Sequence, residues 1–414
     1  MTSSATSADP VDLDAFGRRC REWLAANLTP VSNVSLEEAE SVPTVETARK
    51  VQALLFDGGF AGISWPTEYG GQGLTMTHQR IFNDAAADYF IPTGPIIIGL
   101  GMCAPTLLEH GTKEQRARHI APMLRADEIW CQLFSEPGAG SDLASLQTRA
   151  TPDVDEWVVN GQKVWTSGAH YSDWGLLLAR TNPDVPKHRG LSMFILDLHS
   201  PGVTVRPLVQ MTGRAGFNEV FLDDVRIPAD RVVGTVDGGW RAAIGTLMNE
   251  RVSIGAGGGG LGRGTGGGEF ERLVALARTT GVIDQPRVRD LLAGVYTDSR
   301  VLELLSDRIR ASVRAGQAPG PEGSIAKLAT TELAQRTADA GFEIAGPRAQ
   351  AWVADDQDAE RIAYDVLAYP GNSIAGGTAE IMKNILGERV LGLPKEPQVD
   401  RDIPFRELRT NSAR

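Results

Sequence analysis

Cysteine is scarce in this 414-residue sequence: only Cys20, Cys103 and Cys131 are present, widely separated and odd in number. Neither a disulfide framework nor a CxxC metal site can be drawn from them. The segment from Met1 to Leu13 also lacks the basic region and apolar core of a secretory signal peptide. The sequence therefore predicts a reduced, cytoplasmic protein.

Positive charge is in deficit. Lys and Arg together number 41 against 52 Asp and Glu, which gives a formal net charge of -11. Such a chain repels polyphosphate backbones, and no stretch of it interleaves Lys or Arg with aromatic residues. Nucleic acid is not expected as a partner.

Long hydrophobic runs are missing too. The most apolar stretch, Ile91 to Leu108, is broken by Pro92, Pro95 and Pro105 and by glycines. This pattern favours a buried, interrupted helix over a membrane span. No membrane partner is expected.

Several catalytic signatures are absent. The sequence has no GxSxG segment, which argues against a hydrolase, and its histidines show neither HxxxH nor HxH spacing, so no metal is expected. The glycine run from Gly255 to Gly268 matches GxGxxG repeatedly, but it follows a helical pattern instead of a strand. We interpret this run as a flexible linker.

The pattern along the chain changes twice, and its length suffices for about two to three domains. Apolar residues recur at helical spacing in Leu13–Asn27 and Thr47–Leu55. Strand-like runs such as Trp157–Val159 and Gly175–Ala179 follow, punctuated by the hairpin-type pair Asn160-Gly161. Helical spacing then returns after Gly238-Gly239.

This order predicts an α+β fold, because α/β enzymes usually alternate strands and helices. The predicted parts are a helical N-terminal domain over residues 1–125, a central β domain over 126–238, a C-terminal helical bundle over 239–394 and a polar tail over 395–414.

One glycine-rich octet is unusual in composition. Ser135 to Asp142 reads SEPGAGSD, in which glycines let backbone N–H groups approach a ligand and the Ser135 and Ser141 hydroxyls can bond carbonyl or phosphate oxygens. Such a loop suits a flavin nucleotide. Taken alone, the octet is equally compatible with an ordinary Gly/Pro turn.

A second segment, Asn160 to Gly168, reads NGQKVWTSG. Together the two strings resemble the acyl-CoA dehydrogenase family, which has a close match to SEPGAGSD after its helical N-terminal domain and an NGxKxWxTxG-like segment in its β domain. The resemblance covers nearly the whole chain. It extends to Trp65-Pro66, Tyr69–Gly73, Gly111-Thr112, Glu114-Gln115 and Gly376–Leu391.

The resemblance implies the fold of that family, with a central β-barrel or β-sandwich domain, and an FAD whose ring lies between this domain and the C-terminal helices. Ser135 would bond the pyrimidine side of the ring, Ser167 would reach N5 or the neighbouring carbonyl, and Trp165 would shield the face opposite the substrate. Without the family, Trp165 would be interpreted as a core aromatic residue. The complete set of implied cofactor-binding residues is Gln132, Phe134, Ser135, Gly140, Ser141, Trp165, Thr166, Ser167, Thr378 and Glu380.

The catalytic base departs from the commonest family pattern. Many members carry Glu in a Tyr-Glu-Gly-Thr-like loop before the last helix, whereas this chain has Ala375-Gly376-Gly377-Thr378. A minority branch, whose members handle branched or bulky acyl groups, instead places Glu on the first long helix after the β domain. Glu250, followed by Arg251, matches that branch.

Helical spacing bears on the same residue independently. Ala243, Leu247 and Glu250 share one helix face, so a carboxylate lies on an apolar stripe. Burying an ionised group without a partner costs on the order of several kcal/mol or more, so such a Glu is usually paired, protonated or held there for a reason. By pattern alone, an ordinary Glu/Arg boundary pair is the simpler interpretation.

The resemblance implies that Glu250 takes the α-proton of an acyl-CoA thioester while the β-hydrogen leaves as hydride to FAD, which gives trans-2-enoyl-CoA. The Gly376 N–H would bind the thioester oxygen and Arg251 would orient Glu250. An electron-transfer flavoprotein would accept the electrons, as in fatty acid β-oxidation. The chain would form a homodimer or homotetramer through its C-terminal bundle.

Two segments differ from the family's nucleotide-binding pattern. Arg278–Gly281 replaces an Arg-x-x-Phe-Gly-like segment, and Glu343–Pro347 replaces a Gln-x-x-Gly-Gly-like turn. These differences leave FAD contacts across subunits and a heteromeric assembly open. Two alternative functions therefore stand beside the dehydrogenase: a flavin oxidase or monooxygenase on the same fold, and a non-catalytic partner subunit.

Overall fold

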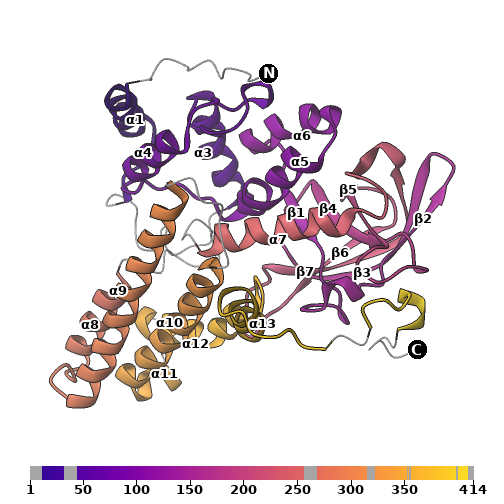
Figure 1. Ribbon diagram of the computed structural model, residues 1–414. Helices are drawn as coiled ribbons and strands as arrows, with labels where there is room; N and C mark the ends of the chain where they lie inside the picture. Colours follow the sequence, from indigo (N-terminus) through magenta and orange to yellow (C-terminus); the bar gives the residue numbers. More distant parts are fainter. Residues whose placement is uncertain are drawn as a thin grey trace.

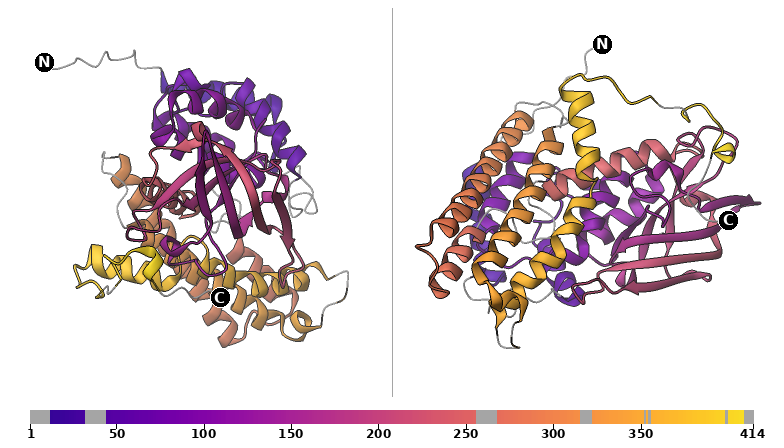
Figure 2. Two further views of the ribbon diagram at one scale, coloured as in Figure 1. Left: turned by 90° about the vertical axis from the view of Figure 1, so that its right-hand side faces the viewer. Right: turned by 90° about the horizontal axis from the view of Figure 1, so that it is seen from below.

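The computed structural model describes residues 12–31, 44–255, 268–314, 322–351, 353, 356–397 and 400–408. Figures 1 and 2 show an N-terminal group of helices, a central sheet and a C-terminal group of helices. The predicted α+β fold is confirmed.

The N-terminal helices form where the sequence places apolar residues at helical spacing. Asp12, Thr44 and Thr112 cap three of them through side-chain oxygens, as expected for N-cap residues. The helices at Leu13–Asn27 and Val45–Asp57 confirm two predicted segments. Helices in this part are α1 Leu13–Asn27, α3 Val45–Asp57, α4 Met76–Ala86, α5 Ala104–His110 and α6 Lys113–Arg125.

The apolar stretch after α4 is interrupted as predicted. A short 3-10 turn, Gly94–Ile96, and a wider π-helical turn, Gly99–Cys103, precede α5. No helix in the described ranges is both long and apolar enough to cross a membrane.

The β domain is one eight-stranded sheet in the order β6-β7-β3-β2-β4-β5-β8, with β1 beside β4. The strands β1 and β2 run parallel to β4, while the other pairs are antiparallel. The strand bounds are β1 Trp130–Leu133, β2 Arg149–Asp153, β3 Glu156–Ser167, β4 Trp174–Arg180, β5 Leu191–Asp197, β6 Val203–Leu208, β7 Phe217–Pro228 and β8 Val232–Val233. The strand predictions at Trp157–Val159 and Gly175–Ala179 are confirmed.

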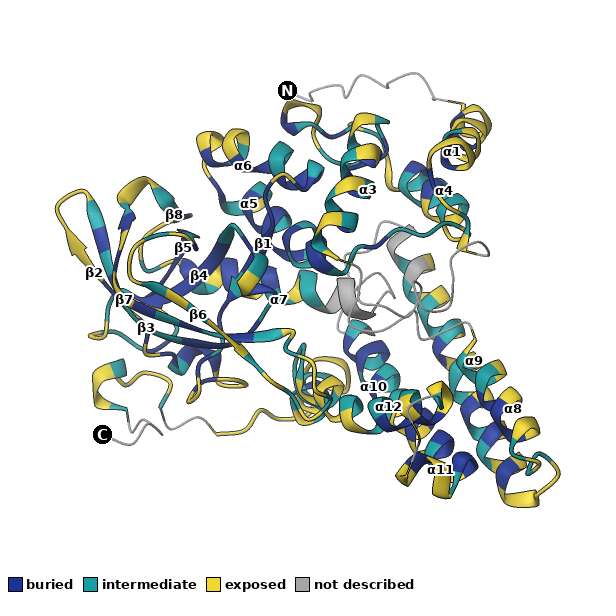
Figure 3. Cartoon of the chain, turned by 180° about the vertical axis from the view of Figure 1, so that it is seen from behind, coloured by how far each residue is buried: buried dark blue, intermediate teal, exposed yellow. Residues whose placement is uncertain are grey.

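The strands β4 and β5 are buried on both faces (Figure 3). Leu176 belongs to the core shared with the N-terminal helices, whereas its neighbour Leu177 belongs to the core on the opposite face. Successive side chains of a strand point to opposite faces, so a continuous apolar run is what a sheet covered on both sides requires.

The turn predicted at Asn160-Gly161 is wrong. These residues lie inside β3, at a register irregularity opposite β7. The Asn160 amide donates to Asp224 Oδ1 at 2.9 Å, and a Cβ on Gly161 would lie 2.7 Å from Thr148 Cα. The glycine therefore permits the close approach of another backbone within a bulged strand, which is a second use of Asn-Gly besides the hairpin turn.

The C-terminal helices divide into two groups. The helix α7, Gly239–Gly255, runs between the N-terminal helices and the sheet and contributes Ala242 and Ala243 to their shared core (Figure 1). The remaining helices have their own core, which includes Leu273, Val295 and Ile344. They are α8 Glu269–Thr279, α9 Pro286–Arg314, α10 Glu322–Ala345, α11 Pro347–Gln350, α12 Gln357–Ile374 and α13 Ala379–Ile385. The predicted linker, Gly255 to Gly268, lies almost entirely outside the described residues.

Candidate functional site

The two glycine-containing strings, which the resemblance assigns to one cofactor, meet in space. The backbone N–H of Val164 in β3 donates to the carbonyl oxygen of Ser135 at 2.9 Å. The octet itself closes on a two-way backbone pairing of Glu136 with Ala139, each N–H donating to the other's carbonyl at 3.0 Å. The structure thus joins the Gln132–Ser141 segment to the strand that carries Trp165, Thr166 and Ser167.

A buried ion pair fixes this junction. Lys163 Nζ lies 2.9 Å from Glu136 Oε1 and donates to the Phe134 carbonyl at 3.0 Å, and the Lys163 side chain is fully buried. The Glu136 carboxylate also accepts from the backbone N–H groups of Gln147 and Thr148 at 2.6 and 2.8 Å. Burial raises the pKa of Glu136, but the Lys163 charge and these donors outweigh that effect and hold its pKa below the ordinary value. Glu136 is therefore ionised at neutral pH.

Trp165 is held in an unusual state for a large aromatic residue. Its side chain is 59% exposed and its backbone φ is +59°, in the left-handed region. The ring packs edge-on against Phe217, with centroids 5.8 Å apart. Non-glycine residues in this region are uncommon and concentrate at functional sites. The geometry supports a ligand-facing role over a core role.

Unpaired polar atoms lie around the same junction. Within the described part of the chain, the buried atoms Gln132 Oε1 and Thr166 Oγ1 have no hydrogen-bond partner. A buried polar group without a partner costs about 1–3 kcal/mol, so such atoms indicate where a ligand completes the network. A Cβ on Gly140 would meet nothing within 4 Å, and Ser141 is exposed. Donors, acceptors, an exposed aromatic and open backbone together fit a flavin nucleotide.

Other predicted cofactor residues contribute in different ways. Phe134 is buried in the core, so only its backbone is available near the octet. Ser167 is half-buried and pairs with Phe217 across the β3–β7 ladder. Thr378 caps α13 by accepting from the Ile381 N–H at 3.2 Å, and Glu380 is exposed in the first turn of that helix.

The predicted base lies on α7. Ala243 is fully buried, Leu247 packs partly buried against the N-terminal core, and Glu250 is half-buried. One turn before Glu250, the buried hydroxyls of Thr246 and Thr106 lie 2.8 Å apart and join α7 to α5. Arg251 belongs to α7, but its side chain lies outside the described part. The apolar face predicted for this helix carries a carboxylate.

The predicted oxyanion turn precedes α13. Gly376 and Gly377 have φ of +67° and +98°, values that side chains with a Cβ adopt only with strain. A Cβ on Gly377 would also lie 2.5 Å from Met382 Cε. The shape of the turn therefore favours glycine at both positions. Their N–H groups lie just before the N-terminus of α13, where the helix dipole favours negative charge.

Lys327 connects this turn with the helix of Glu250. Its side chain on α10 is almost fully buried, and Nζ donates to the carbonyls of Asn372 and Gly377 at 3.0 and 2.7 Å. Burial lowers the pKa of Lys327, while the negative charges of Glu250 and Glu380 raise it in part. The ammonium therefore lies within electrostatic range of both carboxylates while it anchors the turn.

Sequence reasoning quoted Lys163 and Glu136 inside its strings without giving them a role, and it did not consider Lys327. A usable signal was available for Lys163, because a lysine between strand residues Gly161 and Val164 of a covered sheet must find a buried partner. For Lys327 the signal was a lysine in the apolar sequence Ile325 to Leu328.

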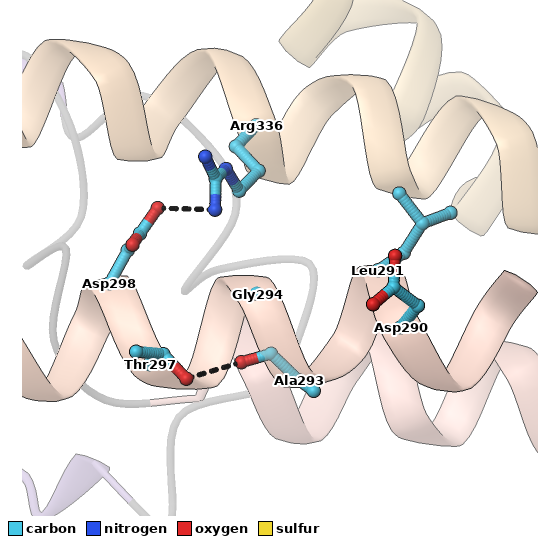
Figure 4. A pocket seen from close by; sticks show the side chains of 7 residues that line it. All are labelled: Asp290, Leu291, Ala293, Gly294, Thr297, Asp298 and Arg336. Atoms are coloured by element: carbon cyan, nitrogen blue, oxygen red, sulfur yellow. Dashed lines mark hydrogen bonds and ion pairs between the residues drawn. The ribbon is translucent and has the colours of Figure 1, made fainter.

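A separate cavity of about 520 Å³ lies between α9 and α10 (Figure 4). Arg336 crosses it and pairs with Asp298 at 2.9 Å. None of the predicted site residues lines this cavity; its lining is Asp290, Leu291, Ala293, Gly294, Thr297, Asp298 and Arg336. Among the described residues, no group of three His, Cys, Asp or Glu side chains could hold a metal ion.

The chain is built from helical, β and helical parts, and its glycine-rich octet is joined to the strand β3. Three family models match it in order: the acyl-CoA dehydrogenase N-terminal domain over residues 11–127, the middle domain over 131–225 and the C-terminal domain over 237–391. The chain belongs to the acyl-CoA dehydrogenase family, a family of oxidoreductases.

Two curated relatives from Mycobacterium tuberculosis are similar along most of the chain. Acyl-CoA dehydrogenase IpdE1 is 37% identical over 93% of this chain and 99% of its own length. Acyl-CoA dehydrogenase FadE34 is 39% identical over 91% of this chain, which spans 51% of that relative.

Solved structures agree with the fold. A chain of the ChsE4-ChsE5 complex from Mycobacterium tuberculosis has a TM-score of 0.73 and 30% identity, covering 96% of this chain and 100% of that one. A chain of the Tcur3481-Tcur3483 steroid ACAD G363A variant has a TM-score of 0.76 and 30% identity, covering 94% and 100%.

Proposed function

We propose that this chain binds FAD at the junction of Gln132–Ser141 with Trp165–Ser167 and dehydrogenates an acyl-CoA thioester between Cα and Cβ. The observation that carries the proposal is that junction. The Val164–Ser135 hydrogen bond and the Lys163–Glu136 pair bring an exposed tryptophan beside open glycine backbone and unpaired buried oxygens. FAD, when bound, supplies the acceptor for the β-hydrogen as hydride.

Glu250 takes the α-proton in this proposal. Glu250 is a half-buried carboxylate on an otherwise apolar helix face, where it can act as a general base toward a weakly acidic C–H bond. The Lys327 ammonium keeps opposite charge within range of that carboxylate. The Gly376 N–H donates to the thioester oxygen and stabilises negative charge that develops there.

A bulky acyl group is the proposed substrate class. The base on α7 resembles the branch that handles branched or bulky chains, and one similar solved structure is named a steroid ACAD. With its membership of the acyl-CoA dehydrogenase family, we further propose a place in lipid metabolism and an electron-transfer flavoprotein as electron acceptor. We propose a cytoplasmic location from the cysteine usage.

A second candidate, a two-chain assembly, rests on a separate observation. One similar structure is titled a complex of two differently named proteins, and several apolar residues on α12 and after α13 are exposed. Those residues are Leu367, Ile374, Val390, Leu391 and Leu393. In this case a second dehydrogenase-like chain covers that surface.

Anaerobic titration of the purified protein with a panel of acyl-CoAs tests the proposal. Bleaching of bound flavin by a thioester, with formation of the 2-enoyl product, is the expected result. Bleaching that begins only when a second chain is co-expressed supports the two-chain assembly. Bound flavin that no thioester bleaches, followed by reactivity with oxygen and another substrate, contradicts the dehydrogenase proposal and supports the oxidase alternative.

A further inference from the structure

The segment Asp400–Leu408, here called the C-terminal strap, packs onto the β domain although it follows the last helices in the chain (Figure 1). Its Phe405 N–H donates to the Val185 carbonyl at 2.9 Å, and its Arg406 N–H donates to the Pro183 carbonyl at 3.0 Å. These bonds dock the strap along the loop between β4 and β5.

Lys187, in that loop, joins the strap to the octet. Its Nζ lies 2.8 Å from Asp400 Oδ2 of the strap and 2.9 Å from Asp142 Oδ2 of the octet. The Lys187 side chain is only 11% exposed, so its charge depends on these two carboxylates. Asp142 also accepts from the Ser145 hydroxyl, which closes the turn after the octet.

Arg180 makes a second connection between the same elements. Its guanidinium lies 3.7 Å from the centre of the Phe405 ring. It donates to the carbonyls of Lys187, Ala144 and Leu146 at 2.6, 2.5 and 3.3 Å. Burial lowers the pKa of Arg180 to about 10, which leaves it charged at neutral pH. Phe405 covers the face of a buried cation whose donors hold residues 144–146.

We propose that the C-terminal strap positions the Ser141–Leu146 turn and thereby retains FAD, with Phe405 and Asp400 as its positioning residues. This inference rests on the proposed FAD site at the octet. The outer side of the octet is exposed at Gly138, Gly140, Ser141 and Asp142. A loop ordered before binding loses less conformational entropy when the ligand arrives, so the strap strengthens binding without touching the cofactor.

The experiment measures release of FAD from the purified holoprotein, followed by the recovery of flavin fluorescence after dilution. The variants are Phe405→Ala, Asp400→Asn and their combination. Losing a ring from a desolvated guanidinium predicts release faster by about three- to tenfold for Phe405→Ala, and by more for the combination. Asp400→Asn alone, which leaves Lys187 paired with Asp142, serves as the milder variant if Phe405→Ala fails to fold.

Arg406→Ala is the matched control. Arg406 belongs to the same strap, but its ion pair with Asp184 is exposed on both sides. Release at the wild-type rate is expected for it. Hydrogen exchange of residues 141–146 gives a second readout, and we expect it to be faster in Phe405→Ala than in the wild-type protein. The thermal midpoint of Phe405→Ala should equal that of Arg406→Ala.

The outcomes separate the two claims. Wild-type rates of release and exchange in both Phe405→Ala and the combined variant would overturn the strap proposal. Equal acceleration in Arg406→Ala would overturn it too, because any disturbance of the segment would then suffice. If the wild-type protein holds no FAD, the FAD site fails, and exchange at residues 141–146 still decides whether the strap orders the turn.

Discussion

Lys163 and Glu136 form a buried pair in which each charge depends on the other. Removing one partner of a buried ion pair leaves an uncompensated charge, so Lys163→Met should lower the free energy of unfolding by about 3–5 kcal/mol. Denaturant unfolding of the two proteins measures this difference. Lys50→Met, which removes one partner of the exposed pair with Glu46, is the control and should leave unfolding unchanged. Similar losses in both variants would contradict the role given to burial.

The same pair predicts a dependence on pH. The folded-state pKa of Glu136 lies below its ordinary value of 4.5, so its contribution is present above that pH and is lost as pH falls through the folded pKa. Wild-type stability should therefore fall more steeply below about pH 4.5 than that of Lys163→Met/Glu136→Gln. Thermal melts from pH 7 to pH 3 provide the measurement, and parallel curves would be inconsistent with a depressed pKa.

Gly377 has a left-handed backbone, with φ of +98°, that disfavours any side chain with a Cβ. Gly377→Ala should cost about 1–2 kcal/mol or more because it forces a left-handed Cβ toward Met382. Slower flavin reduction should accompany the loss, since the Gly376 N–H moves with the turn. Gly371→Ala, in the last turn of α12 with nothing near its Cβ, is the control and should be neutral or stabilising. Equal stability and equal rates of flavin reduction in the two variants would contradict the role proposed for this turn.

At the scale of elements, α7 carries the proposed base and is held to α5 by Thr246 and Thr106. Thr246→Val keeps the shape of the side chain but deletes a buried hydroxyl, which should cost about 0.5–1.5 kcal/mol. The rate of flavin reduction should fall as well, because Glu250 lies one turn further along. Thr297→Val, whose hydroxyl bonds only the Ala293 carbonyl of its own helix among the contacts seen, is the comparison. A drop in stability with an unchanged rate would show that Thr246 supports the fold alone.

Most elements could be predicted from the sequence because periodicity and covered faces are local signals. The helix at Leu13–Asn27 and the strand at Trp174–Arg180 follow directly from the spacing of apolar residues. Asn160-Gly161 could not be assigned correctly, since a turn and a bulge use the same pair. What distinguishes them is the backbone of Thr148, which lies just before β2 and approaches Gly161 closely.

For the candidate site, the sequence identified the segments but not what holds them together. Glu136 and Lys163 are 27 residues apart, and Lys327 reaches a carbonyl 50 residues away, so their partners depend on the fold. The C-terminal strap is a stronger case, because Lys187 and Asp400 are 213 residues apart. The residue types showed that these side chains are charged, but only the tertiary structure showed which partners they bind.

The whole molecule should be stabilised by its cofactor. A ligand that binds only the folded state adds about 2.7 kcal/mol at a hundredfold excess over its dissociation constant. Addition of FAD to flavin-depleted protein should therefore raise the thermal midpoint, and riboflavin, which lacks the nucleotide, should raise it less. A midpoint that does not respond to FAD, in the chain alone and with a second chain co-expressed, would contradict a flavin site in this fold.

The assembly of subunits also concerns the whole molecule. The two segments that depart from the family's cross-subunit pattern are engaged elsewhere or exposed: Glu343 forms a bidentate pair with Arg287 at 2.8 and 3.1 Å, and Arg278 is exposed at the end of α8. The two-chain proposal and the exposed apolar residues of the C-terminal helices are consistent with this difference.

The central claim is that Glu250 is the base of an acyl-CoA dehydrogenation, and stopped-flow flavin bleaching of Glu250→Gln tests it most directly. Glu332→Gln, which alters an exposed carboxylate on α10, is the matched control. With an acyl-CoA that bleaches wild type, Glu250→Gln should bind the thioester but bleach about a hundred- to ten-thousandfold more slowly, and Glu332→Gln should match wild type. Bleaching by Glu250→Gln at the wild-type rate would contradict the account.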